Sequence, residues 1–351
     1  MKAVVKYALG KEKIELRDVE KPVAGKGDLI LEVKAAGVCG SDLNFYHGIH
    51  ELNPPCILGH EFAGIVHEVG EDVTDFKVGD ALVSDNTGHV CGKCYLCSSG
   101  QFTLCPERLG LGYGTDGGFA KYVLIRESVL KTFKNCLMPI PEGISFEEAA
   151  ILDPFANAYK SVVQEGGVMP GDDVVVFGMG ALGLASIQVA RAAGAINIIA
   201  VARNMNEVRF NVAKQMGATH TVATNDQDLE SIVLDVTKGE KSDLVIDAAG
   251  SNAILPVVPK ILRNCCKYIK IGYDHTDVGC SLDEFVNTGI SIVGHFAYDY
   301  TSWRQVLKLL AAGKLDAKSM ITHHLKLSEF LKAFELMDSR EAIRVILYPE
   351  D

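Results

Sequence analysis

The 351-residue sequence lacks long apolar runs and an excess of basic residues. It contains no run of about 20 apolar residues, so a membrane-spanning helix is not expected. No charged start followed by an apolar stretch and small residues marks a secretory signal. The net charge of −11 argues against a nucleic-acid partner, because binding to phosphates needs a basic surface. Internal repeats and low-complexity tracts are absent as well. These absences predict a globular protein that acts without a membrane or a nucleic acid.

What is present is ordinary in composition, with 48% hydrophobic and 23% charged residues. A chain of 351 residues is long enough for two domains, each with its own core. The 34 glycines indicate many tight turns and close backbone approaches.

Four of the ten cysteines lie within fifteen residues of one another: Cys91, Cys94, Cys97 and Cys105. Two short gaps and one longer excursion are the spacing of a closed four-cysteine zinc site. The alternatives are buried free cysteines, or disulfides in a secreted protein, and the density of cysteine in this segment disfavours both. A closed site holds a lobe together but performs no chemistry, so other residues must carry the function. Because free thiols and metal-type spacing fit a reducing compartment, we expect the protein in the cytoplasm.

The first 90 residues alternate apolar and polar side chains between glycine and proline turns, which is typical of short antiparallel strands. The pattern changes at Ser145, where Glu148 three residues later indicates a capping box and the start of a helix. From residue 174, short apolar runs alternate with helix-like stretches. This alternation predicts a parallel, doubly wound sheet. Beyond about residue 302, two helix-like stretches and a strand at 344–348 close the chain.

A G-x-G-x-x-G motif separates the first buried strand, residues 174–177, from the helix that follows it. This context supports a dinucleotide site, whereas the motif alone would be weak evidence. Gly178 permits the tight turn, Gly180 lets the backbone approach a pyrophosphate, and Gly183 lets the helix pack on the strand. Ala181 and Leu182 begin the helix, whose free N–H groups and dipole attract phosphate. A glycine-rich turn without a ligand is the alternative.

The end of the second strand predicts which dinucleotide binds. An NAD site usually has Asp or Glu there to accept hydrogen bonds from the ribose, but this chain has Ala202, followed by Arg203 and later Arg209. Without the carboxylate, a 2′-phosphate is not repelled, and an arginine can bind it with a charge-assisted fork. We therefore expect NADP(H) in preference to NAD(H). The alternative is that Arg203 is a plain surface charge and the site accepts either cofactor.

A second constellation lies upstream, in the stretches Cys39-Gly40-Ser41-Asp42 and Gly59-His60-Glu61. Taken singly, Cys39 would be a core cysteine and His60 a structural histidine. Transfer of a hydride from an alcohol needs an electrophile on the oxygen and an acceptor for the proton. A zinc ion held by a thiolate, an imidazole and a carboxylate, with one open position, supplies the electrophile.

These motifs resemble those of the zinc-dependent medium-chain dehydrogenases of the alcohol dehydrogenase superfamily, and the resemblance covers nearly the whole chain. It also includes the four-cysteine lobe, the nucleotide fingerprint and the stretch Asp116-Gly117-Gly118-Phe119-Ala120. Within the family, residues 153–158 resemble threonine dehydrogenases and residues 39–48 resemble polyol (sorbitol-type) and cyclitol dehydrogenases. His89 is similar to a histidine of the threonine enzymes, although the gap to the cysteine lobe is one residue shorter.

The resemblance implies roles for residues near the reacting centre. Cys39, His60 and Asp153 would be ligands of a catalytic zinc, and Glu61 an exchangeable or indirect one. Ser41 would take the alcohol proton and pass it outward through His47, for which a plain surface histidine is an equally good interpretation. The chain would thus hold two zinc ions, the second in the cysteine lobe.

The resemblance also implies an α/β fold with three parts. Residues 1–154 would form a GroES-like, β-barrel-type catalytic domain that carries the zinc lobe at 88–107. Residues 155–290 would form the Rossmann NADP-binding domain, and residues 291–351 would return to the catalytic domain. Family members are dimers or tetramers, so we expect a homo-oligomer, with a homotetramer among the possibilities.

The polar residues expected around the metal favour a hydroxyl-rich substrate. We therefore expect a dehydrogenase that interconverts a secondary alcohol of a polyol, cyclitol or sugar-derived substrate and its ketone with NADP(H). L-Threonine or another amino alcohol is the alternative substrate. A metal-organised binding protein without activity is the alternative from another class, and a zinc-free reductase would have no need of either cysteine-containing motif.

Overall fold

The computed structural model describes residues 1–350, which divide into two compact units. The first unit joins Met1–Asp153 with two later segments, Asp299–Ala311 and Ala317–Asp351. The second unit joins Pro154–Tyr298 and Ala312–Asp316. The chain therefore leaves the first unit after Asp153, returns to it at Asp299, and enters the second unit once more for the short segment Ala312–Asp316.

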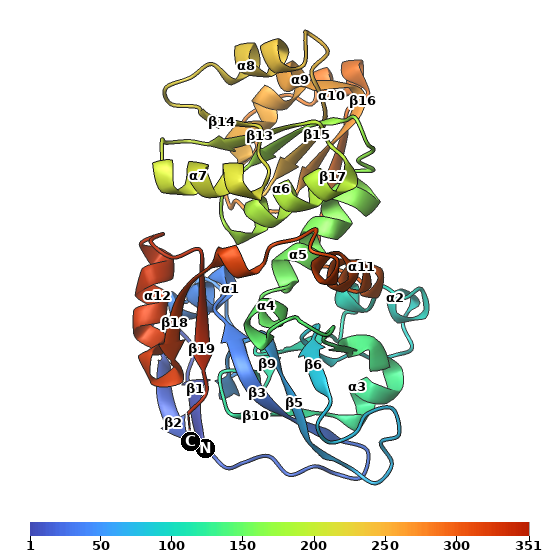
Figure 1. The fold of residues 1–351 in the computed structure, drawn as a ribbon, viewed down its shortest axis with the longest axis vertical. Helices are drawn as coiled ribbons and strands as arrows, with labels where there is room; N and C mark the ends of the chain where they lie inside the picture. Colours follow the sequence, from blue (N-terminus) through green and yellow to red (C-terminus); the bar gives the residue numbers. More distant parts are fainter. Residues whose placement is uncertain (351) are drawn as a thin grey trace. The chain divides into compact units, whose positions relative to one another are not determined.

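A seven-stranded sheet is the frame of the first unit, with the order β11-β6-β5-β3-β19-β18 and with β10 also paired to β3 (Figure 1). Its strands are β3 (Leu29–Gly37), β5 (Glu61–Val69), β6 (Ala81–Ser84), β10 (Tyr122–Ile125), β11 (Leu137–Pro139), β18 (Ile321–Lys326) and β19 (Arg344–Tyr348). The pairing of β19 with β3 is antiparallel and joins the end of the chain to its beginning. This pairing brings residues that are about 310 positions apart in the sequence, such as Gly37 and Ile346, side by side in one sheet.

Two small sheets and several short helices complete the first unit. One sheet contains β1 (Lys2–Lys6), β2 (Ile14–Asp18) and β4 (Cys56–Ile57), and the other contains β7 (Thr87–His89), β8 (Leu109–Leu111) and β9 (Gly114–Thr115). The helices are α1 (Gly40–Tyr46), α2 (Tyr95–Ser98), α3 (Glu127–Thr132), α4 (Phe146–Ala150), α11 (Tyr300–Ala311) and α12 (Phe330–Asp338). One apolar core links the sheet to α12, where Phe330 and Phe334 pack edge to face. Burial of these apolar side chains is the main force that holds the unit together.

The second unit is a six-stranded parallel sheet with the order β14-β13-β12-β15-β16-β17. The strands are β12 (Asp173–Phe177), β13 (Asn197–Ala202), β14 (His220–Ala223), β15 (Ser242–Asp247), β16 (Leu262–Lys270) and β17 (Ser291–Gly294). Every residue of β12 is buried, as expected for a strand with helices on both faces.

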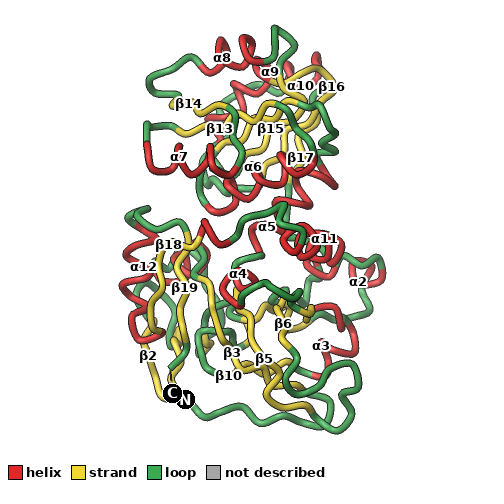
Figure 2. The backbone as a smooth tube through the Cα atoms, in the orientation of Figure 1, coloured by secondary structure: helices red, strands yellow, loops and turns green. Residues whose placement is uncertain are grey.

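Helices cover both faces of this sheet, as Figure 2 shows. They are α6 (Ala181–Ala193), α7 (Glu207–Met216), α8 (Leu229–Val236), α9 (Val258–Ile261) and α10 (Asp283–Thr288). The unit begins within α5 (Asp153–Tyr159), which continues as a π-helical segment, Lys160–Glu165. The predicted fold class, an α/β protein with a β-barrel-type domain and a doubly wound nucleotide-binding sheet, is confirmed.

The local expectations agree with the observed elements. The capping box at the start of α4 is present, because Ser145 Oγ accepts from the N–H of Glu148 (3.2 Å) and the Glu148 carboxylate accepts from the N–H of Ser145 (3.1 Å). The last strand covers Arg344–Tyr348, as predicted, and the helix after the glycine motif runs to Ala193. Within residues 1–350, none of the helices has the length and apolar character needed to span a membrane.

Candidate functional site

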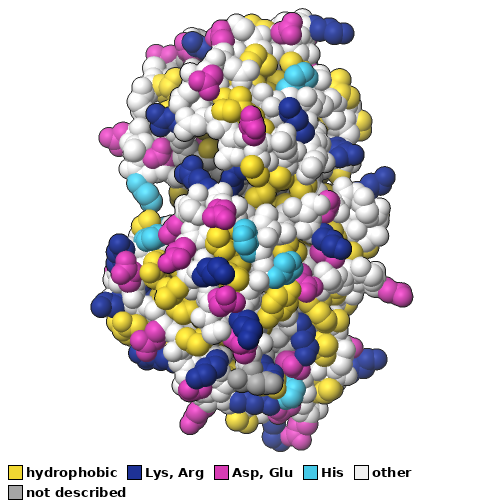
Figure 3. All heavy atoms as spheres, turned by 60° about the vertical axis from the view of Figure 1, so that its left-hand side comes forward, with side chains coloured by type: hydrophobic (Ala, Val, Ile, Leu, Met, Phe, Trp, Pro, Cys, Tyr) yellow, Lys and Arg dark blue, Asp and Glu magenta, His cyan; other side chains and the backbone are white. Residues whose placement is uncertain are grey.

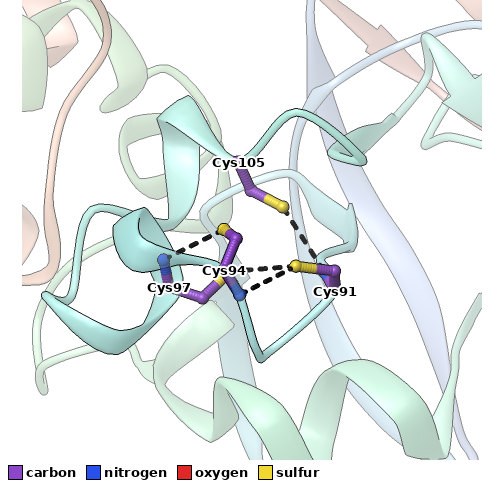
Figure 4. Close-up of side chains that lie close together, drawn as sticks. All are labelled: Cys91, Cys94, Cys97 and Cys105. Atoms are coloured by element: carbon purple, nitrogen blue, oxygen red, sulfur yellow. Dashed lines mark hydrogen bonds between the residues drawn. The ribbon is translucent and has the colours of Figure 1, made fainter.

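The four cysteines of the lobe lie together, as Figure 4 shows, and their sulfur atoms are all within 4.8 Å of one another. The backbone directs the sulfurs to a common centre: the N–H of Cys94 donates to the sulfur of Cys91, and the N–H of Cys97 to that of Cys94, each over 3.4 Å. The N–H of Cys91 donates to the sulfur of Cys105 over the same distance. Four convergent sulfurs held by N–H donors fit a structural zinc ion.

A second group in the same unit contains Cys39, His60 and Glu61, with one candidate ligand atom from each within 4.8 Å of the others. Cys39 is the N-cap of α1, Glu61 is the first residue of β5 and His60 directly precedes it, so the helix and the sheet position all three. Glu61 is only 1% exposed, and among the described residues its Oε1 has no hydrogen-bond partner. A buried carboxylate oxygen without a partner is costly unless a ligand completes it. A thiolate, an imidazole and a carboxylate are the donors that zinc prefers, so this group fits a catalytic metal with an open position.

The neighbouring charges favour the metal-binding form of Cys39 and hold a proton on His60 in the absence of a metal. Burial raises the pKa of the Cys39 thiol, but the neighbouring His60 and Arg344 outweigh burial and bring it down to about 7. Burial lowers the pKa of His60, whereas the negative charges of Asp42 and Cys39 raise it well above its usual value. A thiolate that is accessible near neutral pH is the form that binds a metal.

Asp42 orients the imidazole of His60. Its Oδ1 lies 3.5 Å from His60 Nδ1, and its Oδ2 accepts from the N–H of Cys39 (2.9 Å). A carboxylate beside Nδ1 leaves Nε2 to face a metal. The Ser41 hydroxyl lies 3.3 Å from His60 Nε2, which is the side on which a substrate oxygen would bind. From the sequence, Asp42 was named only as the last residue of the stretch that begins at Cys39. Its position beside His60 could have been inferred, because a zinc-bound histidine usually donates its other ring N–H to a carboxylate.

Sequence reasoning missed Arg344. This arginine is the first residue of β19, is 2% exposed, and forms an ion pair with the Glu61 carboxylate. Gly37 makes room for the pair, since a Cβ there would lie 2.9 Å from Glu61 Oε2. No local sequence signal identifies Arg344, because only the pairing of β19 with β3 brings it to the metal site. The one hint is a charged residue at the start of an otherwise apolar strand.

Asp153, expected as a ligand, is not part of the three-residue group that the described residues form. Its Oδ2 accepts a hydrogen bond from Asn86 Nδ2 (3.2 Å). The Asn86 side chain also contacts the hydroxyl of Tyr113, whose ring packs edge-on against His60 with the centroids 5.7 Å apart. Asp153 is therefore connected to the metal site through two side chains.

The two histidines singled out in the sequence have different surroundings. His47 is half-buried at the C-terminal end of α1, and its Nε2 lies 2.6 Å from Oδ2 of Asp338, the last residue of α12. His89 is half-buried at the end of β7, just before the cysteine lobe.

The glycine motif of the second unit has three distinct environments. Gly178 has a φ of +97°, which disfavours other residues, and a Cβ there would lie 2.9 Å from the backbone nitrogen of Ala249. A Cβ at Gly183 would collide with the carbonyl oxygen of Gly178. A Cβ at Gly180, in contrast, would meet no described atom within 4 Å, so the protein itself does not fill the space beside this residue. Such open space at a helix N-terminus fits a pyrophosphate.

The other residues predicted to bind the dinucleotide lie at the start of α6, at or just after the end of β13, and in α7. Gly180 is the N-cap of α6, and the following Ala181 and Leu182 are half-buried with N–H groups in the first turn, where no intrahelical partner exists. Ala202 ends β13 and Arg203 follows it with an exposed side chain. The Arg209 guanidinium donates to the carbonyl oxygen of Met179 (2.8 Å) and thereby supports the glycine-rich turn.

Asp247, at the end of β15, is a second residue that the sequence did not single out. Its fully buried carboxylate accepts from the N–H groups of Ala249 (3.0 Å) and Gly250 (2.7 Å) and from the hydroxyl of Tyr268 (2.7 Å). These bonds fix the loop against which Gly178 packs. An acidic residue ending a buried strand of a parallel sheet was the available signal.

Comparisons with known proteins agree with this geometry. Residues 25–135 match the family described as Alcohol dehydrogenase GroES-like domain, and residues 181–312 match Zinc-binding dehydrogenase. An uncharacterized zinc-type alcohol dehydrogenase-like protein of Escherichia coli strain K12 is 41% identical over 99% of this chain and 98% of its own. A sorbitol dehydrogenase of Halalkalibacterium halodurans is 35% identical over 100% of both chains. An L-threonine 3-dehydrogenase of Bacillus licheniformis is 34% identical over 99% of both.

Solved structures give the same result. A zinc-binding dehydrogenase of Sinorhizobium meliloti 1021 bound to NADP has a TM-score of 0.89 at 28% identity, with 99% of both chains covered. An alcohol dehydrogenase of Escherichia coli CFT073 complexed with NADH has the same TM-score and coverage at 26% identity. The lobe, the buried thiolate–imidazole–carboxylate group and the glycine motif all lie within the matched regions or beside them. The chain therefore belongs to the zinc-type medium-chain alcohol dehydrogenase family, whose members are oxidoreductases.

Proposed function

We propose that this protein oxidises a secondary alcohol of a polyol, cyclitol or sugar-derived substrate, and reduces the corresponding ketone, with NADP(H) and zinc. The observation that carries the proposal is the buried group of Cys39, His60 and Glu61 with the Ser41 hydroxyl beside it. Such a group could hold a zinc ion with a position open to a substrate oxygen, and the hydroxyl beside His60 is a candidate proton acceptor.

The residues around this group would have separate roles in polarising the substrate, removing its proton and holding the metal. When bound at this group, zinc would act as a Lewis acid that polarises the carbon–oxygen bond of the substrate. Ser41 would accept the alcohol proton, and His47 beside Asp338 would release it towards solvent. Glu61 would exchange between the metal and Arg344, because the arginine balances the carboxylate when the metal does not. Asp153 would be a further ligand, held by Asn86.

Metal analysis of two variants tests this assignment. Wild-type protein should contain two zinc ions per chain, and Cys39→Ala should contain one, keep its cofactor affinity and lose turnover. Cys97→Ala, which opens the lobe, should instead lose stability. Near-normal rates for Cys39→Ala would contradict the assignment. A wild-type protein with one zinc per chain and no turnover would favour the alternative of a metal-organised binding protein.

The preference for NADP(H) rests on the end of β13. Ala202 stands where a ribose-binding carboxylate would exclude a 2′-phosphate, and the exposed Arg203 can reach an anion there. The relatives of known structure include one bound to NADP and one with NADH, so the family permits both cofactors. Arg203→Ala should lower kcat/KM for NADP at least 10-fold and leave that for NAD nearly unchanged. A wild-type preference for NAD would refute the proposal.

The substrate class rests on polar side chains near the metal group, among them Asp42, Asn86 and Asp153. A pocket lined by such polar groups suits the hydroxyl groups of a polyol better than a long aliphatic chain. A relative named sorbitol dehydrogenase supports this class, and one named L-threonine 3-dehydrogenase supports the amino-alcohol alternative. A screen of polyols, cyclitols, ketoses and threonine, read by absorbance of the reduced cofactor, would decide between them. Best turnover of ethanol-type alcohols would contradict both.

We also expect a homo-oligomer. The edge strand β17 and helix α10 expose apolar side chains, including Ile292 and Val286, the latter 78% exposed. An apolar edge strand offers its unpaired backbone groups to a second strand, and a second copy is the simplest partner. Light scattering on the purified protein would measure the mass, and a monomer at all concentrations would contradict this expectation.

A further inference from the structure

A network of polar side chains lies between the two metal sites of the first unit. Asn86 is at its centre, buried in the turn between β6 and β7. Its Oδ1 accepts from the Arg108 guanidinium (2.7 Å) and from the Tyr113 hydroxyl (2.9 Å). Its Nδ2 donates to the Asp153 carboxylate (3.2 Å).

The chemistry of these groups allows one orientation of the Asn86 amide. A guanidinium can only donate hydrogen bonds, so the oxygen of the amide must face Arg108. The nitrogen then faces Asp153, whose carboxylate oxygen accepts from it. Arg108 therefore determines, through Asn86, which atom meets Asp153. The backbone supports this arrangement at some cost, because Asn86 has a φ of +60° and its carbonyl oxygen accepts from the N–H of Leu111 (2.8 Å).

Arg108 belongs to the chain segment that leaves the cysteine lobe. Its N–H donates to the carbonyl oxygen of Cys105 (3.0 Å), so the backbone position of Arg108 depends directly on the last of the four cysteines. Cys105 is itself placed by the N–H of Cys91. The chain from the lobe to Asp153 thus consists of Cys105, Arg108, Asn86 and Asp153 in that order.

We propose that Arg108 and Asn86 are positioning residues through which the cysteine lobe holds the Asp153 carboxylate at the catalytic metal. The lobe then does more than stabilise its own segment. Loss of its metal displaces Arg108, frees the Asn86 amide to turn, and loosens Asp153. This inference depends on the proposed function, because it assigns Asp153 to the catalytic metal.

The test follows the release of zinc from the intact protein into a colorimetric chelator, which needs no substrate. Wild-type protein should release its two ions in two phases, and the phase missing in Cys39→Ala belongs to the catalytic site. Arg108→Met and Asn86→Gly should accelerate that phase about 10- to 100-fold, the range found when a residue that orients a metal ligand is lost. Glycine is chosen at position 86 because it adopts a positive φ without strain. Arg108→Lys, which keeps a donor, should fall between wild type and Arg108→Met.

Controls separate positioning from general destabilisation. Lys93→Met removes a positive charge from an exposed position of the same lobe and should leave both phases unchanged. Cys97→Ser, which lacks the lobe metal, should accelerate the catalytic phase as Arg108→Met does. In the cobalt-substituted protein, Arg108→Met should shift the visible absorption bands, which report the ligand geometry and not the overall stability.

Each outcome discriminates between the two proposals. If wild-type protein binds two ions and turns over, but Arg108→Met and Asn86→Gly release the catalytic ion at the wild-type rate, the positioning role is wrong and the proposed function stands. If wild-type protein binds zinc only in the lobe, both proposals fail. Should Arg108→Met not fold, Arg108→Lys and Asn86→Gly decide the question by the same two measurements.

Discussion

Glu61 and Arg344 form a fully buried ion pair beside the candidate metal ligands. Removal of one partner from such a pair is strongly destabilising, because the other charge stays buried without compensation. Here the carboxylate has a second possible partner, the metal. The pair should therefore contribute most to stability when no metal is bound.

Arg344→Met should lower the unfolding free energy of the first unit by about 3–5 kcal/mol in metal-free protein. The loss should be clearly smaller in zinc-loaded protein, since the ion then neutralises Glu61. Denaturant unfolding of both forms, with Arg344→Lys as the variant that keeps the charge, provides the measurement. Equal losses with and without zinc would show that the metal does not compensate Glu61.

Asp85 predicts a pH dependence of stability. Burial raises the pKa of this carboxyl to about 7, although its Oδ1 accepts from the N–H of Thr87 (2.9 Å). In the unfolded chain, an aspartate titrates near 3.9. Between about pH 4 and pH 7 the unfolded chain has therefore lost a proton that the folded protein keeps, so this residue makes stability fall as pH rises.

Asp85→Asn removes this titration and keeps the acceptor oxygen. Its melting temperature should equal that of wild type near pH 4 and exceed it by several degrees at pH 8, because each unit of pKa shift corresponds to about 1.4 kcal/mol. Calorimetry across this range would measure the difference. Parallel curves for the two proteins would mean that Asp85 is ionised in the folded state.

At the scale of elements, the strand–turn–helix from β12 to α6 separates folding from binding within one motif. Gly183 has no space for a side chain, since a Cβ would collide with the Gly178 carbonyl, whereas Gly180 borders open space. Gly183 thus allows the helix to pack on the strand, whereas Gly180 leaves space for a ligand.

Gly180→Ala should keep the wild-type melting temperature but weaken dinucleotide binding at least 10-fold, because the added methyl occupies the space for the pyrophosphate. Gly183→Ala should lower the melting temperature in the absence of any ligand. Fluorescence titration with the cofactor and thermal unfolding measure the two effects. Unchanged affinity in Gly180→Ala would remove the evidence for a pyrophosphate at this position.

Elements were predictable where their signal is local. The capping box of α4 and the buried run of β12 depend on neighbouring residues, and both are found where expected. Which strand a given strand pairs with is not specified by its neighbouring residues in the sequence. The pairing of β19 with β3 brings Arg344 to Glu61, and nothing within either segment specifies it.

For the whole molecule, the two units have separate cores and carry separate sites. Both candidate metal groups lie in the first unit, and the glycine motif lies in the second. On the face that Figure 3 displays, acidic and basic side chains intermingle.

This separation predicts the response of unfolding to ligands. A zinc chelator should lower the melting temperature of one transition, and the dinucleotide should raise that of the other, because a ligand stabilises the unit that binds it. Differential scanning calorimetry with each addition tests this, and the Gly180→Ala variant should abolish only the response to the dinucleotide. A single transition that shifts equally with both additions would contradict independent units.

The sequence by itself determined the fold class, the cysteine lobe and the glycine motif. The lobe and the motif are encoded by short spacings, because a zinc site or a phosphate turn needs particular residues at fixed separations. Cys39, His60, Glu61 and Asp153 were predicted through the resemblance to a family, with Asp153 as a ligand and Glu61 as an exchangeable or indirect one. Only the tertiary structure decided that Arg344 faces Glu61 and that Arg108 reaches Asp153 through Asn86. Those contacts depend on strand pairing and on the path of the chain around the lobe, which bring together residues that no spacing rule connects.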